Sequence, residues 1–246
     1  MEQEKKFPSE IVELPSKGLL YAEDSPLRSG TIEMKYMTAK EEDILTNQNY
    51  IQKGTVIDKL LQSLIVDKNI NYNELLVGDK NALLVAARIL GYGKDYEFNY
   101  AGEKQLIDLS LINNKEFHPD LEKAGKNEFT FVTPTSNNKL TFKLLTHGDE
   151  IKVQQELDGL RKINKDASPE LSTRLKHMII AVDDNSDVKV VRSFVDNEFL
   201  ARDSRSFRQY LTQIQPDVDL KFYPEGAEEG VDIPIGIGFL WPDANL

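Results

Sequence analysis

Apolar residues recur along the chain at spacings typical of strands or helices. The segment TIEMKYM, from residue 31, alternates apolar and polar positions as a half-buried strand does, and IVEL, from residue 11, has the character of a shorter strand. From Val56 the apolar residues recur at helical spacing through Ile65. The pattern therefore predicts an N-terminal hairpin followed by helices.

Polar residues mark where several helices should begin. Thr38 precedes Glu41 by three residues, the spacing of a capping box, which predicts a helix over residues 39–47. Asp79, Ser168 and Asp203 are each predicted as the N-cap of a further helix. The helix after Ser168 is expected to continue through the apolar run MIIAV, which ends at Val182.

Strand patterns return between and after these helices. Residues 95–112 read as a hairpin around an Ala-Gly turn, and EFTFV and KLTFKLL read as a second hairpin over residues 128–145. Another helix is expected over residues 188–199. The last thirty residues are predicted to form turns and strands.

Two blocks of the sequence resemble each other. With an offset of 124, caps, buried helix positions and turn residues match: Asp79 and Asp203, Leu83 and Phe207, Ala87 and Leu211, Leu90 and Ile214, Phe98 and Phe222, Gly102 and Gly226, Asp108 and Asp232. With an offset of 108, Lys35 matches Lys143, Thr38 matches Thr146 and Glu42 matches Glu150. We interpret the two registers as an internal duplication; the alternative is convergence on common cap and turn rules.

The expected fold is α+β, with two pseudo-repeated units that each contain a β-hairpin, a helical section and a closing β-hairpin. Residues 1–112 form the first repeat with an N-terminal arm, residues 113–128 a linker, and residues 129–246 the second repeat with an apolar C-terminal strand. Two similar but non-identical surfaces in one chain suit a scaffold or an adaptor.

Composition excludes some classes of function. The 246 residues include 30 Lys and Arg against 41 Asp and Glu, a net charge of -11, which argues against nucleic acid as a partner. No cysteine is present, so disulfides, thiolate zinc sites and a cysteine nucleophile are excluded. No apolar run is long enough for membrane insertion. His118, His147 and His177 lack metal-ligand spacing and are expected as surface or cap residues, and no metal or cofactor is predicted.

Two segments are candidates for contact with a partner. Arg205, Arg208 and Tyr210 lie within RDSRSFRQYL, and arginine and tyrosine are frequent anchors of protein interfaces, although they are also ordinary on helix surfaces. Phe239 and Trp241 lie in the apolar C-terminal segment. That segment would either complete the internal sheet or add as a strand to a neighbouring subunit.

The segments LPSKGLLY, MTAKEEDILTN, LLVGDKNALLVAARILGYG, FKLLTHGDE, ARDSRSFRQYL and FLWPD together resemble the T4-type baseplate hub family of contractile-tailed bacteriophages. The resemblance spans residues 14–243. It implies a structural protein of the virion tail baseplate, assembled in the host cytoplasm, that contacts other hub, tail-tube or tape-measure proteins and has no enzymatic activity. A non-virion chaperone for hub or tail assembly is the alternative, and an acidic cell-wall hydrolase is a third reading.

This chain departs from the family at one point. Relatives carry a cysteine pair suited to zinc in the hairpin after the last helix of each copy, whereas FNYAG and FYPEG stand at the corresponding places here. We therefore expect an aromatic cluster between the repeats, formed by Phe98, Tyr100, Phe222 and Tyr223, which would hold the copies together by buried apolar area.

Overall fold

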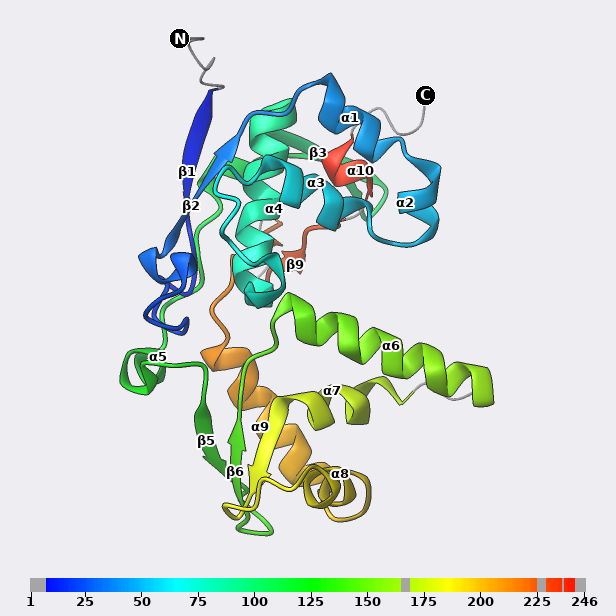
Figure 1. Cartoon of the computed structure of the whole chain (residues 1–246). Coiled ribbons are helices and arrows are strands. Elements are labelled where there is room, and N and C mark those ends of the chain that lie inside the picture. Colours follow the sequence, from blue (N-terminus) through cyan, green and yellow to red (C-terminus); the bar gives the residue numbers. More distant parts are fainter. Residues whose placement is uncertain (1–7, 165–168, 225–228, 236, 242–246) are drawn as a thin grey trace.

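The computed structural model describes residues 8–164, 169–224, 229–235 and 237–241. Within these residues the protein is a mixed α+β structure, in which ten α-helices accompany four small antiparallel sheets. Figure 1 shows two lobes, one built mainly from N-terminal elements and the other from the elements between β5 and α9. We refer to residues 8–112 as the first half and to the described residues from 129 onward as the second half.

The first half begins and ends with a hairpin, as predicted. Its elements are β1 (Ser9–Glu13), β2 (Thr31–Lys35), α1 (Ala39–Leu45), α2 (Gln48–Gln52), α3 (Val56–Leu64), α4 (Val77–Tyr92), β3 (Asp95–Tyr100) and β4 (Glu103–Asp108), with short 3-10 turns at Pro26–Ser29, Tyr72–Glu74 and Leu109–Leu111. Leu60, Leu61 and Leu64 bury one face of α3 completely. Ala101 and Gly102 both have positive φ in the β3–β4 turn, a conformation that suits the twist of a tight hairpin.

A short helix, α5 (Pro119–Ala124), lies in the predicted linker. The second half then contains β5 (Phe129–Val132), β6 (Lys139–Phe142), α6 (His147–Ile163), α7 (Glu170–Met178), β7 (Ile179–Val182), α8 (Val188–Asn197), α9 (Ala201–Ile214), β8 (Lys221–Phe222), β9 (Val231–Asp232) and α10 (Ile237–Leu240). The two predicted hairpins of this half are therefore present. Ser168 and Gly226 lie outside the described residues.

The prediction of a helix through MIIAV was wrong. Met178 ends α7, and the next four residues form β7, which pairs antiparallel with β6 and places Ile179 opposite Phe142. Three of these four residues are β-branched, which favours a strand, and the edge of the β5–β6 hairpin offers the missing backbone partners. A periodicity argument cannot separate a short apolar strand from the end of a buried helix.

The predicted apolar C-terminal strand is present only as β9, and the structure after β9 was not predicted. Beyond β9 the described residues form the four-residue helix α10, which packs against α4 of the first half. Figure 1 shows this helix among the N-terminal elements rather than beside the lobe that contains α9. The helical turn lets Phe239 and Leu240 be buried together, with exposed fractions of 1% and 0%.

Two isolated bridges attach the second half to the rest of the chain, one to the first half and one to the linker. Next to the Leu76–Thr146 bridge, the amide of Val77 donates to the carbonyl of Leu145 at 3.2 Å, and the amide of His147 donates to that of Leu75 at 2.7 Å. The second bridge pairs Asn114 with Val218. Among the described helices, none combines the length and apolar character that crossing a membrane requires.

Candidate functional site

Asp79 holds the loop of the first hairpin. Its buried carboxylate lies in the first turn of α4 and accepts hydrogen bonds from the amide of Ser16 at 2.9 Å, from the Ser16 hydroxyl at 2.6 Å and from the Tyr21 hydroxyl at 2.5 Å. The Tyr21 hydroxyl in turn accepts from the amide of Leu76 at 2.9 Å. Burial raises the pKa of Asp79, against the effect of these bonds.

Asp203 makes the corresponding connection in the second half. Its buried carboxylate lies in the first turn of α9 and accepts from two backbone amides of the β5–β6 loop, that of Thr135 at 2.8 Å and that of Ser136 at 3.0 Å. Burial opposes ionisation, but the bonds from Thr135 and Ser136 outweigh it and lower the pKa of Asp203.

Neither aspartate is the N-cap that the sequence predicted. The caps are Leu76 and Leu200, and each aspartate is the third residue of its helix. An aspartate before an apolar helical stripe resembles a cap locally, whereas here each carboxylate binds a loop more than sixty residues earlier in the chain. A short-range pattern does not reveal that partner.

In each half a lysine pairs with a carboxylate in the first turn of the first helix after the opening hairpin. Glu41 accepts from Lys35 Nζ at 2.7 Å, from the Ser63 hydroxyl at 2.8 Å and from the amide and hydroxyl of Thr38. Burial alone would raise the pKa of Glu41, but these bonds lower it to about 2. In the second half Asp149 accepts from Lys143 Nζ at 2.7 Å and from Thr146, and its pKa is lowered against the effect of burial.

Three of the four residues of the expected aromatic cluster meet. The ring centroid of Phe222 lies 5.4 Å from that of Phe98 and 5.9 Å from that of Tyr100, both in edge-to-face geometry. Tyr96 extends the group toward Phe239, with ring centroids 4.9 Å apart. These aromatic contacts connect the β3–β4 hairpin of the first half to β8 and α10 of the second half.

Tyr223 does not belong to this cluster. Its side chain is 56% exposed, and its hydroxyl donates to Asp219 at 3.2 Å. Strand alternation explains the difference, because successive side chains of an extended segment point to opposite faces and Phe222 takes the inner one.

The structure separates the three candidate residues of α9. Arg205 and Arg208 are exposed, three residues apart on the outer side of the helix. Tyr210 is half-buried instead; its ring stacks on Phe131 at 5.4 Å and its hydroxyl donates to Asp120 of α5 at 2.9 Å. The two arginines therefore share an open surface, and Tyr210 fixes α5 to α9.

The C-terminal candidates lie within the fold. Phe239 is almost fully buried against Tyr96, so its predicted role at a partner surface is wrong for this structure. Trp241 is half-buried and packs against the same core. Both side chains support internal packing, the other role considered for this segment.

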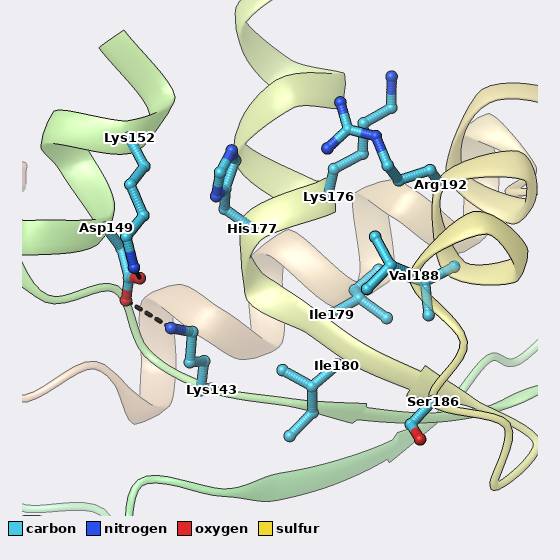
Figure 2. A pocket seen from close by; sticks show the side chains of 11 residues that line it. Lys143, Asp149, Lys152, Lys176, His177, Ile179, Ile180, Ser186, Val188 and Arg192 are labelled. Atoms are coloured by element: carbon cyan, nitrogen blue, oxygen red, sulfur yellow. Dashed lines mark hydrogen bonds and ion pairs between the residues drawn. The ribbon is translucent and has the colours of Figure 1, made fainter. Parts of the chain in front are cut away.

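A pocket of about 320 Å³ lies between α6, α7, β7 and α8 and was not predicted from the sequence. Figure 2 shows Lys143 and Asp149 on one side and His177, Lys176 and Arg192 on another, with the apolar side chains of Ile179, Ile180 and Val188 below the basic group. Its basic side chains have carboxylate partners: Lys176 pairs with Asp196 at 2.6 Å, and Glu156 pairs with both His177 and Arg192. The pocket therefore carries little uncompensated charge.

The histidines occupy three different settings. His118 caps α5 by accepting from the amide of Asp120, as a cap residue should, and His177 pairs with Glu156. His147 is buried, contrary to expectation, with its ring 4.7 Å from that of Tyr72. Across the described ranges, no three histidine, aspartate or glutamate side chains come together as a metal-binding group.

A second, more apolar groove of about 250 Å³ lies beside α9. Six apolar side chains line it together with four polar ones: Val77, Leu145, Leu171, Leu175, Met178 and Leu211, and Glu150, Arg174, Arg208 and Gln215. Leu171 is 46% exposed, so the groove opens to solvent along an apolar edge. Of these lining residues, only Arg208 was a candidate for partner contact from the sequence. The lining includes residues of four helices, α4, α6, α7 and α9, and the sequence does not show that these helices lie side by side.

Comparison with family models, with curated proteins and with solved structures finds no match to this chain.

Proposed function

We propose that this protein is a structural subunit of the baseplate hub of a contractile phage tail, assembled in the host cytoplasm, that binds other hub, tail-tube or tape-measure proteins. The ordered series of motifs from LPSKGLLY to FLWPD supports this assignment. The protein acts by presenting surfaces and has no enzymatic activity in this proposal.

Within this role the chain consists of two copies of one unit. Helices α4 and α9 begin at Val77 and Ala201, which differ by the sequence offset of 124, and each follows a leucine cap. Lys35 with Glu41 and Lys143 with Asp149 correspond at the offset of 108. Phe98 and its counterpart Phe222 touch each other, as matched residues near a pseudo-twofold axis do.

Strand pairing supports the same correspondence. After α3, Ile65 forms an isolated antiparallel bridge with Met34 of β2. After α7, Ile179 pairs with Phe142 of β6, and Phe142 corresponds to Met34 at the offset of 108.

The closing hairpins do not share one register. Lys221 faces Asp232, whereas their counterparts Glu97 and Asp108 do not face each other, and the two registers differ by two residues.

The observation that carries the proposal is the shared use of Asp79 and Asp203. Each buried carboxylate spans from the first turn of a long helix to the loop of the opening hairpin. A carboxylate that is saturated with such hydrogen bonds holds the backbone in place, and this use of both residues suits a rigid scaffold.

Mass spectrometry of purified tail particles from a phage that encodes this chain tests the proposal. A hub subunit is retained in stoichiometric amounts relative to other baseplate proteins. A morphogenetic chaperone, the alternative, would bind hub components during assembly and be absent or greatly sub-stoichiometric in particles. Its absence would therefore contradict the structural role, and a zymogram with cell-wall substrate that gave a clearing zone would favour the hydrolase reading.

A further inference from the structure

The first turns of α4 and α9 occupy matched positions but have different surroundings. On α4, a Cβ atom at Gly78 would lie 1.8 Å from the carbonyl oxygen of Pro216, so the segment after α9 runs directly against this helix. Asn81 Nδ2 donates to the Asp217 carboxylate at 3.0 Å, and the following Val218 is buried. A short acidic segment thus covers this face of α4.

The matched face of α9 is open. The offset of 124 places Arg202, Arg205 and Arg208 where α4 has Gly78, Asn81 and Leu84, and all three arginines are exposed. In the described part of the chain, arginine–carboxylate ion pairs are made by Arg161, Arg174 and Arg192, and none of the three guanidinium groups of α9 has such a partner. Arg208 Nε donates only to the carbonyl of Ser204, within its own helix, at 3.4 Å.

Three exposed arginines without carboxylate partners, all on one helix, are unusual for a chain with a net charge of -11. Arg208 also lines the apolar groove beside α9, as Arg174 does. The surface therefore combines a cationic stripe with an adjoining apolar groove. Such a pair of features selects a partner that offers carboxylates and apolar side chains together.

We infer that the α9 surface, defined by Arg202, Arg205, Arg208 and the adjoining groove, binds an extended acidic segment of a partner protein. The inference rests on the proposed duplication, because the occupant resembles the segment that covers the matched face of α4. That segment, Pro216 to Leu220, alternates aspartate with apolar residues. In extended backbone its carboxylates and apolar side chains point to opposite faces, so one face can meet the arginines while the other enters the groove.

Fluorescence anisotropy with the full-length chain and a labelled peptide of sequence QPDVDLK, that of residues 215–221, tests this inference. The double variant Arg205→Glu/Arg208→Glu is compared with Lys40→Glu/Lys53→Glu, which changes net charge equally at exposed lysines outside the α9 surface. We expect saturable binding with Kd at or below about 1 mM at low salt. Affinity should fall about tenfold or more in the arginine variant, stay unchanged in the lysine variant, and weaken with salt.

Three outcomes overturn the inference. One is no saturable binding by the wild-type chain up to millimolar concentration, and another is equal binding by the two double variants. The third is wild-type self-association, measured by sedimentation velocity, that the arginine variant abolishes, which would make a second copy of this chain the occupant. Thermal melts verify that both variants are folded. Failure of the peptide to bind would contradict the α9 inference only. The proposed hub role is tested separately by mass spectrometry of tail particles, so failure of one proposal can be distinguished from failure of the other.

Discussion

The two halves use a buried aspartate for the same purpose but supply it with different donors. Asp79 receives one backbone amide and two hydroxyl groups, and burial raises its pKa. Asp203 receives two backbone amides, which together with the side chains of Thr135 and Ser136 lower its pKa. Hydroxyl groups can rotate and become acceptors, whereas backbone amides cannot. Two aspartates that both hold a loop can therefore tolerate different substitutions.

The halves also differ in what covers their long helices. Part of α4 is closed by the segment after α9, and the matched part of α9 is open to solvent. Substitutions at corresponding positions should therefore have different effects in the two halves.

The largest effect is expected from Phe98→Ala. This side chain is 8% exposed and packs against Tyr96 and Phe222, so its removal should lower the free energy of unfolding by about 3–5 kcal/mol. Chemical denaturation measures the loss. Tyr223→Ala is the control, with an expected change within about 0.5 kcal/mol, because that side chain lies outside the cluster. Equal stability of the two variants would contradict an aromatic connection between the halves.

Gly78→Ala should have the next largest effect. The added methyl group would clash with the carbonyl oxygen of Pro216. This atom belongs to the backbone and cannot rotate away as the end of a flexible side chain could, so the free energy of unfolding should fall by about 1–3 kcal/mol. The matched substitution Arg202→Ala falls on an exposed position and should change stability by less than about 0.5 kcal/mol. Thermal or urea unfolding of the two variants compares a covered face with an open one, and similar values would show that the faces do not differ.

Asp203→Asn should destabilise the protein more than Asp79→Asn. An asparagine side chain has one acceptor oxygen, so its NH2 group would point at an amide donor in the β5–β6 loop. At Asp79 the hydroxyls of Ser16 and Tyr21 can reverse and accept from the new NH2 group, and loss of a buried charge offsets part of the cost. Melting temperatures of the two variants measure the order, and the opposite order would refute this account of the donors.

A smaller effect concerns acid stability. The pKa of Glu41 is about 2 in the folded protein and 4.5 ordinarily, so its ionised form stabilises the fold above pH 4.5. This contribution is lost as the pH falls through about 2. Glu41→Gln should therefore flatten the decline in urea midpoint over this window, and Asp149→Asn should do the same in its half, where the pKa is also lowered. An unaltered pH profile in both variants would contradict the lysine–carboxylate pairs.

Local patterns predicted the hairpins and most helices because alternation, helical spacing and turn residues act over a few neighbours. They failed where distant partners decide the structure. Asp79 and Asp203 bind remote loops instead of capping their helices, and Ile179 to Val182 became a strand because β6 has a free edge. The aromatic contact between Phe98 and Phe222 was expected from the resemblance between the two sequence blocks, whereas the groove beside α9 depends on how four helices pack.

The claim that one half is closed by its own chain and the other is open to a partner is tested most directly by a reconstruction of a tail baseplate that contains this protein. We expect an acidic segment of a neighbouring subunit to lie along α9, with carboxylates at Arg205 and Arg208 and an apolar side chain in the adjoining groove. A baseplate in which this subunit is located and the face of α9 is left to solvent would contradict it.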